Sequence, residues 1–395
     1  MVEIVLAGGA RTPFGDFGKS LRDVPLQQLA IHAVKSSLAK AGIKPNDADN
    51  MVFGNVTPVD REAAIVSRVV AVNSGMPVES GAMSVNRACA SGLQAIVSAA
   101  ENIASGESRV GVAAGGENFS RIPFIARNMR WGDIKGHVQL EDGADVIYRC
   151  GFSGELMGST AENVAERFGY TREEMDAWGL MSQRRAQAAI ESGFLAKQVV
   201  PIEVADGKAK RLLERDEFPR FGITAEKLAS LRPVFRKEGG RITPGSSSGV
   251  TDGAAAIIVA DKKAADDLGM KPDARLLGWA VAGVPPDIMG IGPVPATRKL
   301  LGKFGLSVDD VDYFEINEAF AAVNLHAERE LGVSRDKTNL YGGGISLGHP
   351  PGATGLRMMM TAIDHLKETG GRYAVITMCI GGGQGMAGLI ERIPH

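Results

Sequence analysis

The chain has 395 residues, of which 44% are hydrophobic and 23% charged, and its net charge is -2. This composition excludes a disordered chain, and the small net charge gives no reason to expect nucleic acid or an anionic membrane as a partner. No apolar run approaches the roughly 20 residues of a membrane span, and three cysteines are too few for a disulfide framework. We therefore expect a cytoplasmic protein of two or three domains.

The first predicted elements lead to a cysteine. The N-terminal "MVEIVLAGGARTPFG" lacks a basic segment followed by a long apolar one, so it predicts a first strand and not a signal peptide. Later, "AMSV" predicts a strand, and a helix follows from about Ala90, with apolar side chains at helical spacing. Cys89 lies where the strand gives way to the helix. A helix N-terminus favours a thiolate, so Cys89 is a candidate nucleophile, with an inert buried cysteine as the alternative.

The middle of the chain, residues 120–250, has a different character. The stretch "GSTAENVAERFGYTREEMDAWGLMSQRRAQAAIESG" predicts two helices. Between Gly207 and Arg241 there are ten Lys or Arg and five Asp or Glu, a net of +5. A solvated basic face and a site for a phosphate-bearing ligand both explain this excess. The length and charge indicate an insertion that forms a lid or a ligand-binding subdomain.

Two glycine patterns resemble motifs of other enzymes. "GSSSG" (245–249) matches the nucleophile elbow of serine hydrolases, which needs a strand before it and a helix after it. Here a turn-like stretch precedes it and the strand-like "GAAAIIVA" follows, so a hydrolase using Ser247 is a remote alternative. "GQGMAG" (383–388) matches a dinucleotide fingerprint, but too few residues follow for the crossover helix. No group of residues has zinc-ligand spacing, so we expect no metal.

An internal repeat with an offset of 263 positions organises the chain. It pairs "CASGLQ" from Cys89 with "GATGLR" from Gly352, and also pairs Asp49 with Asp312 and Arg109 with Arg372. Several matches at one offset indicate a duplication. We predict two similar α/β halves: residues 1–119 begin the first, 120–250 form the insertion, 251–270 return to the first half, and 271–395 form the second.

The second copy contributes further candidate residues. His349 lies three residues before Gly352, in the loop that leads into the twin helix. If the copies pack about a pseudo-two-fold axis, the two helix starts face each other and His349 approaches Cys89. Asn317, in "EINEAF", and Cys379, in "MCIGGG", follow or end predicted strands of the second copy. One edge of the sheet structure can therefore collect all four side chains.

These motifs carry a family resemblance. "NRACASGLQAI", "NEAFA", "GGGISLGHPPGATG" and "MCIGGGQGMAG", in this order, resemble the motifs of the thiolase family, as do "RTPFG" and "LMGSTAENVA". The resemblance runs essentially from end to end. It implies an α/β fold of two repeated βαβαβαββ halves in a layered α-β-α-β-α arrangement, with a CoA-binding loop domain inserted in the first half. It also implies a homodimer or homotetramer.

The resemblance implies acyl transfer between CoA thioesters. Cys89 would carry the acyl group, His349 would deprotonate Cys89, and Cys379 would exchange the α-proton of acetyl-CoA. Asn317 would hold a water beside the enolate oxygen, and the N–H groups of Cys89 and Gly381 would stabilise the tetrahedral intermediate. CoA is expected as substrate and product, with no tightly bound cofactor. The matched CoA contacts are Met157, Arg220, Ser248, Ala319 and Phe320.

The residues give conflicting indications of the acyl chain length that the protein prefers. Met289 matches a residue that limits the acyl pocket in short-chain members, which favours an acetyl-CoA C-acetyltransferase. Leu156 stands where those members usually have histidine, "PGSSSG" replaces their commoner "AGNASG", and "GGENFSRIPFIARNMRWG" is more similar to 3-ketoacyl-CoA thiolases. A broader-chain 3-ketoacyl-CoA thiolase of fatty-acid β-oxidation is therefore the alternative.

Overall fold

The first half of the chain has the predicted order of elements. The computed structural model describes residues 2–127, 129–131 and 137–394. Strands and helices alternate, and two strands, β5 and β10, end the series; the insertion lies between these two strands. The elements are β1 (Ile4–Arg11), α1 (Leu26–Ala41), β3 (Asn50–Gly54), α2 (Val66–Asn73), β4 (Gly81–Val85), α3 (Ser91–Ala104), β5 (Val110–Glu117) and β10 (Thr251–Asp261).

The second half repeats this order with one reduction. Its elements are β11 (Ala274–Gly283), α9 (Pro293–Phe304), β12 (Tyr313–Ile316), α10 (Ala321–Leu331), α12 (Pro351–Thr369), β13 (Tyr373–Ile380) and β14 (Gln384–Arg392). Where the first half has β4, the second has only an isolated bridge between Phe314 and Thr338, followed by the short helix α11 (Gly344–Leu347).

The strands of the two halves form one continuous sheet in the order β12-β13-β14-β11-β1-β10-β5-β3-β4. The halves join where β1 pairs with β11 through only two residue pairs, Val5 with Arg275 and Leu6 with Ala274. Alternate residues of β5 face different helices: Val112 and Ala114 pack in the cluster that contains α1, whereas Ala113 packs in the cluster that contains α3 and α12.

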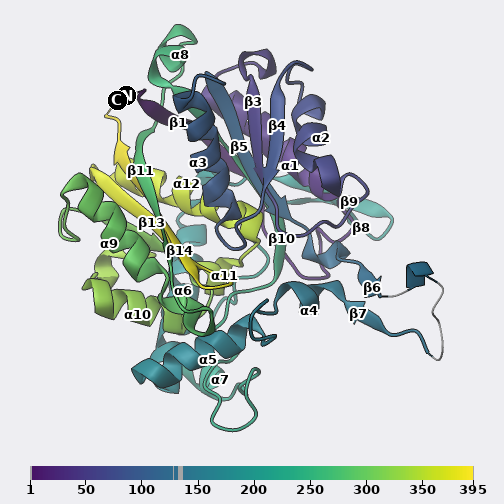
Figure 1. Ribbon diagram of the computed structural model, residues 1–395, viewed down its shortest axis with the longest axis vertical. Coiled ribbons are helices and arrows are strands. Elements are labelled where there is room, and N and C mark those ends of the chain that lie inside the picture. Colours follow the sequence, from purple (N-terminus) through teal and green to yellow (C-terminus); the bar gives the residue numbers. More distant parts are fainter. Residues whose placement is uncertain (1, 128, 132–136, 395) are drawn as a thin grey trace.

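This alternation produces the expected layers. Helices α1 and α2 cover the outer face of the N-terminal strands, α9 and α10 cover the outer face of the C-terminal strands, and α3 and α12 lie between them (Figure 1). The two central helices touch by backbone at their starts, because a Cβ on Gly355 would lie 2.3 Å from the Leu93 nitrogen. Gly92 makes the equivalent close approach to Gly352. The thiolase-like fold class is confirmed.

Repeated hydrogen bonds explain why acidic residues recur at the repeat offset. The Asp49 carboxylate accepts the backbone N–H of Arg109 at 2.8 Å, and Asp312 accepts that of Arg372 at 2.6 Å. Each aspartate therefore fixes the start of the strand that follows a central helix. Sequence matches that looked weak singly mark one conserved piece of geometry present in both halves.

The chain between β5 and β10 holds the two predicted helices, α5 (Met157–Phe168) and α6 (Arg172–Glu191). It also contains hairpins β6 (Phe124–Ala126)–β7 (Leu140–Asp142) and β8 (Ile202–Asp206)–β9 (Ala209–Leu213), with the short helices α4 (Gly143–Ile147) and α7 (Ala225–Ala229). Parts of "RNMRWG" lie outside the described residues. The division into domains at 120, 250 and 270 stays a prediction. No helix in the described ranges is long and apolar enough to cross a membrane.

Candidate active site

Cys89 sits on a strained turn between β4 and α3. The preceding residue, Ala88, has a φ of 44°, which is unfavourable for a residue with a side chain. Two side chains hold this turn: Asn86 Oδ1 accepts the Ala88 N–H at 2.9 Å, and Ser91 Oγ donates to the Ala88 carbonyl at 2.7 Å. Cys89 itself is half-buried and forms no disulfide.

The sulfur of Cys89 faces backbone donors and a second thiol. Burial raises the pKa of the Cys89 thiol, while the N–H groups of Gly381 and of Cys89 itself lower it. These are the two donors expected to stabilise a tetrahedral intermediate. Cys379 lies one residue before the end of β13 and is fully buried, and its pKa is raised well above the ordinary value by burial and by the charge of Cys89. The two thiols are therefore close, and both are protonated at neutral pH.

The hydrogen bonds of His349 assign its tautomer. Thr354 Oγ1 donates to the Pro350 carbonyl at 2.9 Å, so it accepts the proton of His349 Nδ1, which lies 2.6 Å away. This leaves His349 Nε2 without a proton, 3.3 Å from Asn317 Nδ2. Burial, and then the positive charge of Arg357, lowers the pKa of His349 to about 3. The imidazole is therefore a neutral base.

Asn317 follows β12 and is anchored by its backbone. Its N–H donates to the Thr377 carbonyl at 2.9 Å. The side chain is fully buried, and its Oδ1 has no partner among the described residues. The amide therefore keeps an acceptor for a group other than protein, which the predicted water-holding role requires.

A pocket of about 270 Å³ opens beside this cluster. Its lining includes four predicted positions: Met157, Ser248, Phe320 and His349. Ala319 is not part of the lining, but its carbonyl accepts the N–H of Ser248 at 2.9 Å. The other walls come mainly from the insertion and are largely apolar: Ala144, Asp145, Tyr148, Leu156, Gly158, Phe235, Ser247, Gly249 and Val250.

Arg220 lies one side chain away from this pocket. Its guanidinium is 4.9 Å from the centre of the Phe218 ring, and that ring packs against Gly249 of the lining. It also pairs with Asp16 at 3.2 Å. Other cations of the basic stretch are paired too, including Arg236 with Glu166 at 2.8 Å. Much of the +5 excess is thus neutralised by acids elsewhere in the chain.

Sequence reasoning missed some residues of the site. Met289 is buried in the same apolar cluster as Cys379 and does not line this pocket, so its expected role in limiting the acyl chain stays a prediction. Tyr148 and Phe235 line the pocket without having been singled out. Thr354, which orients His349, could have been found, because the repeat pairs it with Ser91, the residue that holds the Cys89 turn.

The competing motifs do not form sites. Ser247 Oγ donates to the Thr243 carbonyl at 2.8 Å, and strand β10 follows the serines where a nucleophile elbow needs a helix. Among residues 2–127, 129–131 and 137–394, no group of three or more His, Cys, Asp or Glu could hold a metal.

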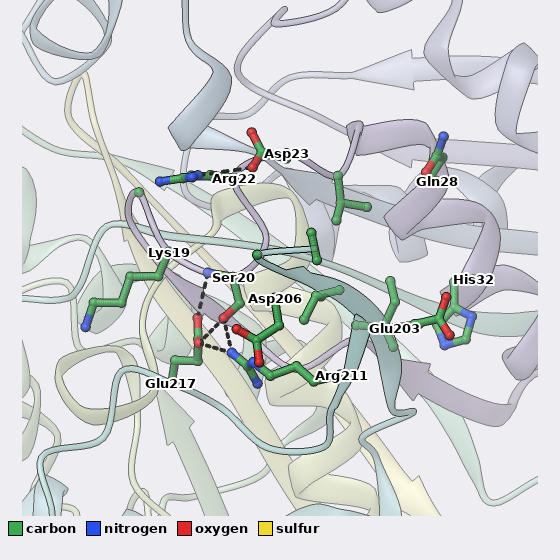
Figure 2. Close-up of a pocket in the computed structure, with 16 residues that line it drawn as sticks. Lys19, Ser20, Arg22, Asp23, Gln28, His32, Glu203, Asp206, Arg211 and Glu217 are labelled. Carbon is green, nitrogen blue, oxygen red and sulfur yellow. Dashed lines mark hydrogen bonds and ion pairs between the residues drawn. The ribbon is translucent and has the colours of Figure 1, made fainter. Parts of the chain in front are cut away.

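A larger hollow of about 920 Å³ lies beside the β8–β9 hairpin (Figure 2). Several charged and polar groups on its wall already pair with one another: Ser20 donates to Glu217 at 2.5 Å, and Arg22 binds Asp23 at 3.1 Å. We therefore place the candidate active site at the smaller pocket, beside Cys89.

Comparisons with known proteins identify the family of the chain. The family model for the thiolase N-terminal domain matches residues 4–263, and that for the C-terminal domain matches residues 270–392. The chain therefore belongs to the thiolase family, and it is an acyltransferase of that family.

Its relatives carry two kinds of name. The chain is 44% identical to Beta-ketothiolase BktB of Cupriavidus necator and 41% identical to an acetyl-CoA acetyltransferase of Syntrophomonas wolfei, each over 99% of both chains. The crystal structure of human mitochondrial 3-ketoacyl-CoA thiolase superposes with a TM-score of 0.97 at 39% identity, covering 99% of both chains. The same human enzyme in complex with CoA gives a TM-score of 0.96.

Proposed function

We propose that this protein is an acetyl-CoA C-acetyltransferase, which condenses two acetyl-CoA into acetoacetyl-CoA and CoA and catalyses the reverse cleavage. The observation that carries the proposal is the placement of Cys89: its sulfur faces two backbone N–H groups and a second thiol. The relatives named acetyl-CoA acetyltransferase support the class of reaction.

In the first half-reaction, Cys89 becomes acetylated. His349 Nε2 takes the thiol proton as the sulfur attacks the thioester carbonyl, because the raised pKa of Cys89 keeps the thiol protonated until then. A carbon–sulfur bond to Cys89 forms and the bond to the CoA sulfur breaks. The departing CoA thiolate takes the proton of the Cys379 thiol, so Cys379 becomes a thiolate and His349 keeps its proton on Nε2. The N–H groups of Cys89 and Gly381 stabilise the oxyanion.

In the second half-reaction, a second acetyl-CoA loses an α-proton to the thiolate of Cys379. The resulting carbanion attacks the acetyl group on Cys89, a carbon–carbon bond forms, and the Cys89 thiolate leaves. Burial suits Cys379 to this step, because a thiolate whose pKa is raised is a stronger base toward a weakly acidic C–H. The protonated Nε2 of His349 and a water held by Asn317 stabilise the enolate oxygen, and His349 then returns its proton to the Cys89 thiolate.

CoA binding is assigned to the pocket and its rim. Met157, Ser248, Ala319 and Phe320 would contact the pantetheine arm, and Arg220 would contact a phosphate. CoA acts as substrate and product, which the CoA complex of the human relative supports. A homodimer or homotetramer and a cytoplasmic location remain predictions.

A broader-chain 3-ketoacyl-CoA thiolase is the second candidate, favoured by the apolar Leu156 in the pocket wall and by the names of several relatives. Each methylene that an apolar pocket accepts contributes about 0.8 kcal/mol. The test is thiolytic kcat/KM across 3-ketoacyl-CoA substrates of rising chain length. A sharp fall beyond four carbons would establish the acetyltransferase, whereas a maximum at longer chains with little cleavage of acetoacetyl-CoA would establish the alternative.

A further inference from the structure

Glu117 is a fully buried acid at the end of β5, close to the candidate active site. Its carboxyl group accepts the backbone N–H of Val56 at 2.7 Å and that of Thr57 at 3.1 Å, and the side-chain amide of Asn55 at 2.9 Å. The first turn of α12 lies against the same strand end, because a Cβ on Gly352 would lie 2.6 Å from the Gly116 nitrogen. Burial raises the pKa of Glu117 to about 8, and the backbone N–H groups around it, that of Gly352 included, lower it. One side chain therefore joins the ends of β3 and β5 in the first half to the first turn of α12 in the second.

The first turn of α12 carries the orientation of His349. Thr354 in this turn binds His349 Nδ1 at 2.6 Å, and the His349 N–H donates to the Gly249 carbonyl at 3.0 Å. The turn has little freedom elsewhere, because a Cβ on Gly115 would lie 2.1 Å from the Gly352 carbonyl oxygen. A small displacement of Gly352 would reach His349 through Thr354.

The repeat marks Glu117 as an addition to one copy. Its twin at the offset of 263 is Ile380, an apolar residue, just as the twin of Cys89 is Gly352. A buried acid that only the first copy carries is not required by the shared architecture of the two halves. Burying a polar group is unfavourable unless it is hydrogen-bonded, so Glu117 depends on the N–H groups that it accepts.

We propose that Glu117 is a positioning residue that sets the place of His349 relative to Cys89 by binding the first turn of α12. This rests on the thiolase reaction proposed above. Glu117 does not touch the reacting atoms; it acts through Gly352 and Thr354. The partners of the Glu117 oxygens are N–H donors, so replacing one oxygen by an NH₂ group places donor against donor and shifts the turn. Misplacement of a base by about 1 Å slows catalysis about 100-fold.

The test compares Glu117→Gln with Asp49→Asn. Asp49 also accepts backbone N–H groups of β5, but at the opposite end of the strand. Both variants should lose thermal stability. Only Glu117→Gln should lower kcat for acetoacetyl-CoA cleavage by about 10- to 100-fold, with KM within about 3-fold. If Glu117→Gln does not fold, Glu117→Asp, which keeps the carboxyl group and shortens its reach, carries the same comparison.

A second readout needs no CoA substrate: the rate of Cys89 alkylation by iodoacetamide, which a misplaced His349 should slow by 5-fold or more. Slower alkylation supports the positioning role even if wild-type protein fails to form acetyl-Cys89, a failure that would reject the proposed function instead. If Glu117→Gln and Asp49→Asn have the same kcat and the same alkylation rate, the inference is overturned. Glu117 would then only stabilise the backbone of residues 55–57.

Discussion

The regions around the starts of the two central helices, α3 and α12, have equivalent backbones but carry different residues. The offset of 263 pairs three candidate catalytic residues, Cys89, Asn317 and Cys379, with three glycines, Gly352, Gly54 and Gly116. We call the first set the open twin and the second the closed twin. A Cβ on Gly352 would lie 2.3 Å from the Gly54 carbonyl oxygen and 2.6 Å from the Gly116 nitrogen. The closed twin has no room for side chains.

The difference shows how a duplicated fold makes a single site. Backbone contact at the closed twin fixes the two halves against each other, and the open twin holds two thiols and an amide at the equivalent positions. Cys89 therefore corresponds to Gly352 in the repeat because the first copy supplies the nucleophile and the second supplies close backbone packing.

The largest effect is expected when the open twin is made like the closed one. Cys89→Gly removes the nucleophile, so we expect thiolytic kcat to fall about 10,000-fold or more, as loss of a catalytic nucleophile does elsewhere. The free energy of unfolding should fall by only about 1 kcal/mol, because an added glycine loses more conformational freedom on folding. Mass spectrometry after incubation with acetyl-CoA checks the reason: wild type should carry acetyl on Cys89. Acetyl found only on Cys150 would reject the assignment.

The converse change should break the fold more than the chemistry. Gly352→Ala places a methyl group against backbone atoms of Gly54 and Gly116, so we expect a loss of about 3 kcal/mol in the free energy of unfolding. Urea denaturation measures it. The matched control is Gly302→Ala on α9, where a Cβ meets nothing within 4 Å; it should gain about 0.5–1 kcal/mol. Equal stability of the two variants would contradict the closed twin.

Much of this comparison could be predicted from sequence, and the reasons for the rest are physical. The repeat, the central helices and the motif positions follow from local spacing, because apolar period and turn chemistry are local. The reduced third strand of the second half is not local, since a single bridge at Thr338 depends on which chain lies beside it. The contacts of Glu117 likewise depend on residues far away in sequence.

Thr354 and Ser91 are hydroxyl residues at equivalent positions of the repeat, and they have different partners. Its twin, Ser91, holds the Cys89 turn, whereas Thr354 holds the imidazole. Thr354→Val keeps the shape but removes the acceptor for His349 Nδ1, so the tautomer that leaves Nε2 free is no longer favoured. We expect kcat to fall about 10-fold with KM for acetoacetyl-CoA nearly unchanged. Rescue by Thr354→Ser would show that the hydroxyl is responsible, and failure of that rescue would point to packing.

Asp364 on α12 and its twin, Glu101 on α3, differ in environment. Burial raises the pKa of Asp364 to about 6, whereas the Gln198 amide lowers it. The folded state therefore favours the protonated form, and this stability is lost as pH rises from about 4 to 6. Asn cannot ionise, so Asp364→Asn does not lose this stability. The free energy of unfolding of the variant, relative to that of wild type, should therefore rise by about 1–2 kcal/mol between about pH 4 and pH 6. Glu101→Gln, at an exposed position, should show no such pH-dependent gain in urea denaturation.

The smallest effect should come from the rim of the open twin. Only the first half carries an insertion between its last two strands; β13 and β14 are joined by three residues, so the closed twin has no equivalent of Arg220. Arg220 is about half exposed and already paired with Asp16, so its contact with a CoA phosphate competes with that ion pair and with water. Arg220→Ala should raise KM for CoA about 3- to 10-fold and leave kcat within 2-fold, the pattern of lost uniform binding. Arg236→Ala, which removes a cation paired with Glu166, is the control and should leave both constants unchanged. An unchanged KM with a collapsed kcat in Arg220→Ala would instead place this side chain in the chemistry.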